Sequence, residues 1–244
     1  MHIELSLHRF RRGLFAATGV IAGAGLVADV CDHLLAPAWA PTLVPLLSLS
    51  YEHNLPTWYA VILHAACAWL LVMQGLSVRG GARAVAPARA AGPVPWLVLG
   101  GLFAFISMDE LIQIHEAASD WFDTGGVLYF GWIIPAGALV AALGLCYLPF
   151  LRALPDRTRR RFIVAGVTFV SGALLIELPL GYWTERAGSD NLVYAGIDWL
   201  EETLELVGVT MFLLALLDIP GRAPARLHVD IDAPDPDARG SRTR

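Results

Sequence analysis

Acidic and histidine side chains interrupt several of the long apolar stretches of this chain. One stretch carries Asp109 and Glu110, followed by His115 and Glu116. Another has a single glutamate, Glu177, between isoleucine and leucine neighbours. Carboxylates combined with a few imidazoles are ligands that zinc, iron and manganese accept in proteins. These residue types therefore predict a site for a divalent metal ion, which could activate water or oxygen.

Helical spacing groups the acidic residues further. At about 100° per residue, Asp198, Glu201, Glu202 and Glu205 fall within an arc of about 100° on one helix face. The same geometry predicts that Asp109, Gln113 and Glu116 share a face, within about 60°. The predicted metal ligands are Asp109, Glu110, His115, Glu116, Glu177, Glu201, Glu202, Glu205, His33 and His64.

So many carboxylates cannot all ionise side by side at membrane depth without a partner. Arginine does not supply that partner, because Arg186 is the only basic residue expected on the same side of the membrane. Three explanations remain open: a bound metal cation, protons shared between carboxyl groups, or carboxylates that flank water and pair with histidine.

The elements that position these residues follow from the composition. The 244 residues are 56% hydrophobic and 16% charged, and the mean hydropathy is +0.57. This excludes a disordered chain, and three cysteines exclude a disulfide scaffold. We expect an all-α polytopic integral membrane helix bundle with six transmembrane helices. The predicted spans are Leu14 to Ala36, Thr57 to Leu76, Pro95 to Glu116, Tyr129 to Leu151, Phe162 to Trp183 and Ile197 to Leu217. Pro179 is expected to kink the fifth span.

The arginines predict the orientation of these spans. All 17 basic residues are arginine, and all of them except Arg186 fall in the termini or in alternate loops. The positive-inside rule therefore places both termini in the cytoplasm, an N-in/C-in topology. The predicted location is an inner (plasma) membrane of bacterial type, and the predicted site faces outward.

The domain organisation is simple. We expect a cytoplasmic N-terminus over residues 1–13, a transmembrane domain over residues 14–218 and a disordered cytoplasmic tail over residues 219–244. The glycine- and arginine-rich segment Ser77–Pro93 is expected to be a flexible linker. Motifs for nucleotide phosphates, dinucleotides or zinc proteases are absent from the sequence, and no basic patch indicates nucleic acid.

Two short motifs are loosely similar to those of integral-membrane hydrolases of the ceramidase and adiponectin-receptor group. They are Glu52-His53-Asn54-Leu55-Pro56-Thr57 and Ser107-Met108-Asp109. The resemblance implies a multi-helix bundle with a metal site of His and Asp. The paired His-x-x-x-His of that group is absent here, so the sequence does not assign the chain to it.

Three functional hypotheses follow. The first is a metal-dependent membrane enzyme, a hydrolase or an oxidoreductase, acting on a lipid or a small periplasmic substrate. The second is a cation- or proton-coupled transporter or channel that uses the same carboxylates. The third is a sensor or an assembly factor without catalysis. The lipid bilayer is the expected partner in all three, and a homo-oligomer stays open.

Overall fold

The computed structural model describes residues 7–79, 92–119, 121, 122 and 124–219 of the chain. The predicted disorder of the tail from residue 220 onward lies outside the described residues, as do residues 80–91 of the predicted linker. Within the described residues all regular structure is helical, which confirms the all-α fold. The elements, in chain order, are α1 (Leu7–Leu35), α2 (Ala40–Leu47), α3 (Leu55–Arg79), α5 (Val94–Ile112), α6 (Ile114–Ser119), η1 (Gly126–Leu128), α7 (Ile133–Cys146), α8 (Leu148–Ala153), α9 (Asp156–Val170), η2 (Ser171–Ile176), α10 (Glu177–Ala187) and α11 (Leu192–Leu217).

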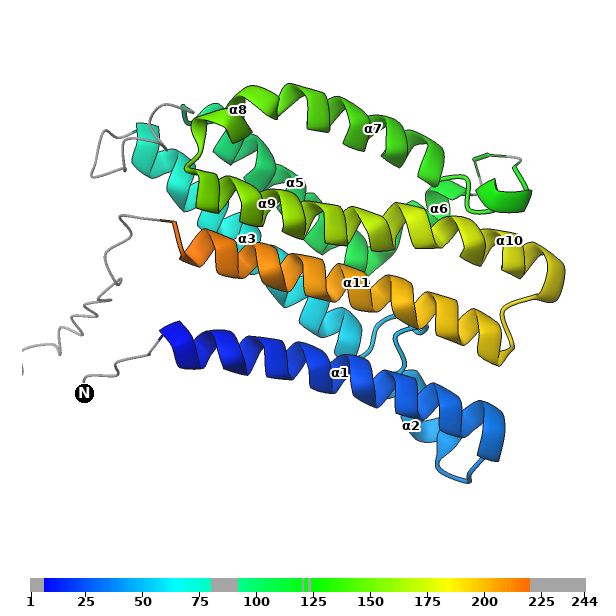
Figure 1. The fold of residues 1–244 in the computed structure, drawn as a ribbon. Helices are drawn as coiled ribbons and strands as arrows, with labels where there is room; N and C mark the ends of the chain where they lie inside the picture. The colour runs from blue at the N-terminus through cyan, green and yellow to red at the C-terminus, as the bar shows by residue number, and fades with distance from the viewer. Residues whose placement is uncertain (1–6, 80–91, 120, 123, 220–244) are drawn as a thin grey trace, which may run out of the picture.

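The long helices lie side by side in one bundle, and the ends of successive helices alternate between its two ends (Figure 1). The start of α1 and the end of α11 lie at one end, which we call the terminal end. The end of α1, the short α6 and the start of α11 lie at the other, which we call the pocket end.

Four helical segments of the described chain are long and apolar enough to cross a membrane. They span His8–Leu35, Leu55–Arg79, Val94–Ile112 and Asp156–Ala187. Large apolar side chains such as Trp69 and Leu145 are exposed on the outside of the bundle, where lipid would cover them. Four candidate membrane-spanning helices support the prediction of a membrane protein.

The fourth predicted span is not one continuous helix. The α7 helix, Ile133–Cys146, is apolar but has only 14 residues, and α8 follows it after Tyr147. Pro149 lies in the first turn of α8. Because proline lacks a backbone N–H and clashes with the preceding turn, it separates the two helices.

The third predicted span also ends early. The α5 helix stops at Ile112 because Gln113 adopts a left-handed conformation, with φ of 56°. The predicted face shared by Asp109, Gln113 and Glu116 is therefore wrong, since these residues do not belong to one continuous helix.

In the fifth predicted span, the π-helical segment η2 (Ser171–Ile176) lies directly before Glu177. This wide turn precedes Pro179, the residue expected to kink the span. Single π-helical turns of this kind are frequent at functional sites.

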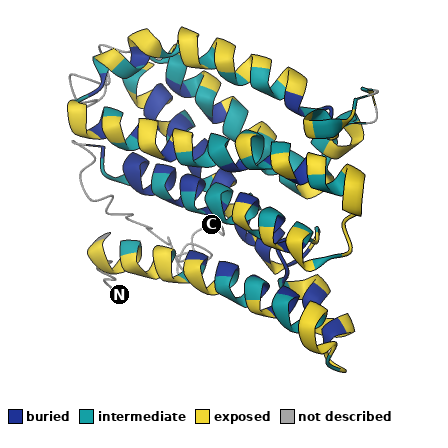
Figure 2. Ribbon diagram, turned by 45° about the vertical axis from the view of Figure 1, so that its right-hand side comes forward, coloured by how far each residue is buried: buried dark blue, intermediate teal, exposed yellow. Residues whose placement is uncertain are grey.

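The α11 helix is the centre of the bundle, and its second half is almost continuously buried (Figure 2). It packs against α9, α1 and α3. Gly208 permits a close approach to α9, because a Cβ at that position would lie 2.6 Å from the backbone nitrogen of Phe169.

An aromatic core fills the terminal end of the bundle. The fully buried ring of Trp96 lies 4.8 Å from that of Phe150, measured between ring centres. Phe162 and Phe212 continue the aromatic cluster, with 4.7 Å between their ring centres. This packed end holds the helices in register, so that their other ends can frame a cavity.

Candidate functional site

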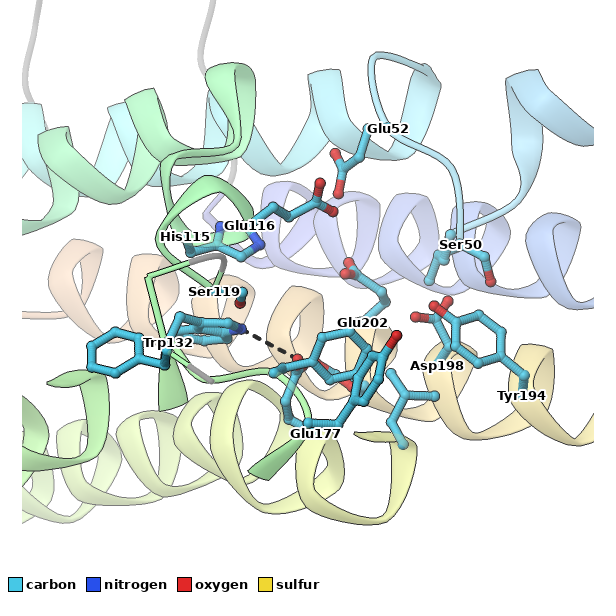
Figure 3. A pocket seen from close by; sticks show the side chains of 16 residues that line it. Ser50, Glu52, His115, Glu116, Ser119, Trp132, Glu177, Tyr194, Asp198 and Glu202 are labelled. Carbon is cyan, nitrogen blue, oxygen red and sulfur yellow. Dashed lines mark hydrogen bonds between the residues drawn. The ribbon is translucent and has the colours of Figure 1, made fainter. Parts of the chain in front are cut away.

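A pocket of about 610 Å³ opens at the pocket end of the bundle (Figure 3). Six acidic side chains line it, from the loop before α3, from α6, from α10 and from α11. They are Glu52, Glu116, Glu177, Asp198, Glu201 and Glu202. His115 and several aromatic residues, among them Trp132 and Tyr194, complete the wall. We call this cavity the acidic pocket.

Several oxygen atoms of the acidic pocket are buried without a hydrogen-bond partner. They include Oδ2 of Asp198 and Oε2 of Glu201, whose residues are only 9% and 6% exposed. The hydroxyl of Ser119 is unpartnered as well. Buried polar groups normally have a hydrogen-bond partner, so these oxygens are the polar atoms that a molecule or ion in the pocket would contact.

Arginine does not neutralise this pocket in the part of the chain that the structure describes. The arginine ion pairs there involve Asp156 and Asp218, and neither of these lines the pocket. Arg186 stacks over the ring of Tyr182, 4.2 Å from its centre. The acidic pocket therefore has no arginine among its lining residues, and His115 is the one candidate cation there.

Two of the pocket carboxyl groups lie very close together. Glu177 and Glu201 are within hydrogen-bonding reach of each other. Two carboxylates cannot hydrogen bond directly unless they share a proton, and a cation between them would serve the same purpose. Gly172 brings α11 near this point, since a Cβ there would lie 2.6 Å from the carbonyl oxygen of Glu201.

The break after α5 folds His115 back onto Asp109. The Oδ1 atom of Asp109 accepts the backbone N–H of His115 at 2.9 Å, and Oδ2 lies 2.8 Å from Nδ1 of the imidazole. Asp109 does not line the acidic pocket, whereas His115 does. The left-handed turn at Gln113 makes this return possible, and it could not occur in a continuous helix.

Trp132 connects two walls of the acidic pocket. Its ring centre lies 5.1 Å from that of His115, and its indole N–H donates to Oε1 of Glu177 at 3.3 Å. Figure 3 shows this bond between the His115 side of the pocket and Glu177. The relative placement of the imidazole and the carboxylate is thus constrained by one rigid side chain.

Two pocket groups outside the helices α5, α10 and α11 have shifted pKa values. Burial raises the pKa of Glu52, and the nearby carboxylate of Glu116 raises it further. Burial by itself would lower the pKa of His115. The hydrogen bond and the charge of Asp109, together with the charges of Glu116 and Glu110, outweigh that effect and raise it. Both groups therefore hold a proton to higher pH than free side chains do.

A second, very small cavity lies behind the acidic pocket. It has room for about one water molecule, and its wall includes Glu52, Glu110 and Glu202. Because Glu52 and Glu202 line both cavities, Glu110 adjoins the acidic pocket without being part of its wall. Glu205 lines neither cavity, although its side chain packs near Gly172 beside the π-helical segment.

The two remaining predicted ligands lie apart from the acidic pocket. His64 is 1% exposed, and its Nδ1 lies 2.9 Å from the carbonyl oxygen of Ala60. That nitrogen is 3.9 Å from Oε1 of Glu110, and the imidazole packs against Phe103 and Phe169. His33 contacts the backbone of its own helix through the carbonyl of Asp29.

The structure thus brings five of the ten predicted ligands to one pocket wall. They are His115, Glu116, Glu177, Glu201 and Glu202. Within the described residues, no three His, Cys, Asp or Glu side chains are arranged as a ready metal site. The acidic pocket has suitable donors, but they do not converge on one point.

The predicted ligand set omitted Glu52 and Asp198, which line the pocket. Asp198 lies on the same helical stripe as Glu201, so its spacing was enough to include it in the predicted site. Glu52 lies in the loop that enters α3, and its position depends on how that loop folds over α11. Local sequence periodicity carries no such information.

Comparison with known proteins adds a family but no activity. Residues 13–219 match the family described as "Domain of unknown function (DUF8692)". The chain belongs to this family. The match covers nearly the same residues as the predicted membrane domain, 14–218, so the DUF8692 region includes the acidic pocket. No curated protein and no solved structure matches the chain.

Proposed function

We propose that this DUF8692 member is a six-span membrane enzyme that binds a divalent metal cation in its acidic pocket. Both termini are cytoplasmic, and the pocket faces the opposite side of the membrane. The six crossings are α1, α3, α5, α7 with α8, the continuous α9–η2–α10 segment, and α11. Arg11 near the start of α1, Arg79 at the end of α3 and Arg161 in the first half of α9 support this orientation, because these helix ends lie at the terminal end of the bundle (Figure 1).

The observation that carries the proposal is the concentration of carboxyl groups in the acidic pocket, with no arginine among its lining residues. Six carboxyl groups share one cavity with a single histidine, and two buried oxygens, on Asp198 and Glu201, have no partner. Desolvated like charges repel strongly, so a cation bound among them would relieve a large electrostatic cost.

The cation would be held by Glu177, Glu201 and Glu202, with His115 and Glu116 on the facing wall. Since these donors do not form a ready set of three, binding requires carboxylate side chains to rotate toward the cation. Zinc, iron and manganese all accept this mixture of oxygen and nitrogen ligands. Such a metal would activate water for a hydrolase or oxygen for an oxidoreductase.

The position of the pocket supports a substrate that arrives from the outer leaflet or the periplasm. The wall also contains Phe122, Tyr129 and Phe130, which offer apolar surface beside the acidic groups. A lipid, or a small molecule with an apolar part, suits this combination.

Transport through the same carboxylates is the second candidate, and the packing disfavours it. Beyond Glu205, the α11 side chains from Leu206 to Leu216 are mostly buried in the apolar core. The hydroxyls of Thr18, Tyr59 and Thr210 lie within this layer, but they hydrogen bond to one another. Within the described residues an ion would meet no continuous polar route to the terminal end.

Elemental mass spectrometry of the detergent-purified protein, prepared without chelator, tests the proposal. We expect zinc, iron or manganese near one equivalent or above, and a clear loss in Glu202→Gln and His115→Ala. Asp190→Asn is the matched control, because Asp190 is exposed and does not line the pocket. A folded, monodisperse wild type that neither contains nor takes up metal would refute metal binding and direct attention to proton exchange.

A further inference from the structure

Both carboxylate oxygens of Asp109 contact one residue, His115. Oδ1 accepts the backbone N–H of His115, and Oδ2 contacts Nδ1 of the same residue. An ionised carboxylate can only accept hydrogen bonds, so Nδ1 must carry the hydrogen in this contact. The other ring nitrogen, Nε2, then keeps its lone pair when the imidazole is neutral.

His115 lines the acidic pocket, and the ring of Trp132 packs against the imidazole at an angle of 57°, with 5.1 Å between the ring centres. In Figure 3, His115 and Glu116 lie on one side of the cavity, across from Glu177. A cation held by Glu177 and its neighbours would therefore find a nitrogen donor on the opposite wall.

Capping of the start of α6 does not fully explain this geometry. The first turn of α6 leaves backbone N–H groups without an acceptor in the helix, and Oδ1 of Asp109 accepts that of His115. The second contact, between Oδ2 and Nδ1, contributes nothing to the cap. Its effect is on the imidazole, since it selects one tautomer and fixes the orientation of the ring.

We propose that Asp109 is a positioning residue that holds His115 as the Nδ1–H tautomer, so that Nε2 can coordinate a divalent cation in the acidic pocket. This inference rests on the proposed function, and it gives Asp109 a different role from the ligand role expected from the sequence. The left-handed backbone conformation of Gln113 is part of this arrangement, because it turns the chain back so that His115 reaches Asp109.

Asp109→Asn separates the two roles of the carboxylate. The amide oxygen of asparagine can still accept the backbone N–H, so the helix cap is retained. Its NH₂ group faces Nδ1 and can only donate, so Nδ1 becomes an acceptor and the hydrogen moves to Nε2. We expect a folded protein in which the nitrogen facing the pocket can no longer bind a cation.

The first measurement is nitrogen NMR of histidine-labelled protein, free of metal and at alkaline pH, with His115→Gln to assign the signal. Wild type should show the Nδ1–H tautomer of His115, and Asp109→Asn the Nε2–H tautomer. A wild type with the hydrogen on Nε2 would overturn the inference. This readout needs no metal and no known substrate, and the wild-type result decides even if the variant fails to fold.

The second measurement is titration of the same proteins with Mn²⁺ and Zn²⁺. We expect Asp109→Asn to weaken binding by about 10- to 100-fold, the usual effect of removing a group that orients a metal-bound histidine. Asp190→Asn should bind as wild type does. Unchanged affinity in a folded Asp109→Asn protein would overturn the positioning role while leaving the proposed function intact. A wild type that binds neither cation would refute the proposed function, and the ligand role of Nε2 with it.

Discussion

The two ends of the bundle differ in packing and in charge. At the terminal end, aromatic rings pack closely, and the largely buried carboxylate of Asp218 forms ion pairs with both Arg11 and Arg161. At the pocket end, carboxyl groups from four separate elements face one cavity with unpartnered oxygens. The packed end stabilises the fold. The pocket end lowers that stability, because it keeps a cavity lined with acidic groups open.

This difference teaches where function lies in the molecule. Sites that bind charged ligands are commonly strained in the absence of the ligand, and the rest of the structure must compensate. Substitutions at the terminal end should therefore lower stability without changing cation affinity. Substitutions in the acidic pocket should lower affinity and leave the cation-free protein as stable as before, or more stable.

The largest effect is expected from Trp96→Ala at the terminal end. Trp96 is fully buried against Phe150 and Phe162, so its removal leaves a large cavity. We expect a loss of about 3–5 kcal/mol in the free energy of unfolding. Denaturant titration of the purified protein measures it, with Trp69→Ala as control, because Trp69 is 66% exposed. Equal effects of the two substitutions would contradict a packed terminal end.

Gly208→Ala should be next. The new methyl group would meet the backbone of Phe169, which cannot move aside without separating α9 from α11. A loss of about 1–3 kcal/mol is expected from such overpacking. Gly166→Ala is the control, because its methyl group meets nothing within 4 Å. The thermal unfolding temperature of this variant should be unchanged or slightly higher than that of wild type.

Cation affinity should increase with pH. Glu52 and His115 have raised pKa values, so protons compete with the cation at higher pH than they would on free side chains. Each proton displaced adds about tenfold in affinity per pH unit as long as the pH is below the pKa of that group. For His115 this range extends above the ordinary pKa of 6.5. Titrations from acidic to alkaline pH should give a shallower slope for His115→Gln than for wild type, and identical slopes would exclude His115 as a ligand.

Glu201→Gln should separate stability from binding. It removes one of two adjacent carboxyl groups, and the new amide can donate a hydrogen bond to Glu177. We expect the cation-free variant to be more stable by on the order of 1 kcal/mol, while its cation affinity falls. Unfolding curves measured with and without metal test both the stability of the cation-free variant and its cation affinity. Lower stability in the metal-free variant would mean that Glu201 has a structural role.

The smallest effect is expected from Asp218→Asn. The pairs with Arg11 and Arg161 are lost, but both arginine side chains are about one-third exposed, at 34% and 29%. Pairs screened in this way contribute roughly 0.5–1 kcal/mol. Asp156→Asn is the control, because Asp156 is 78% exposed and should give no measurable change. The thermal midpoints of the two variants, measured in parallel, decide the question.

The helices could be predicted from the sequence, but their interruptions could not. Long apolar stretches predict helices wherever the chain crosses a membrane, and each of the six predicted spans contains helix. The turn at Gln113 and the π-helical segment before Glu177 depend on tertiary contacts. For example, Asp109 fixes His115 only after the chain has turned back.

The same distinction applies to the acidic pocket. Helical periodicity brought Glu201 and Glu202 into the predicted site, because both lie on one stripe of α11. It could not predict Glu52, which reaches the pocket from a loop, or Trp132, whose contact with Glu177 joins residues 45 positions apart. It also placed Asp109 among the ligands, although its side chain contacts His115 and does not line the pocket.

The π-helical segment Ser171–Ile176 has a consequence for sequence variation within the DUF8692 family. A π-helical turn holds an extra residue, so removing one residue from it would restore a regular α-helix and leave both flanks on their original faces. The same deletion in the middle of α3 would turn everything after it by about 100° around the helix axis. Family members that differ by one residue at this point could therefore still present the equivalent of Glu177 to the same cavity. Elsewhere in the long helices such a change in length would turn one flank away from its partners.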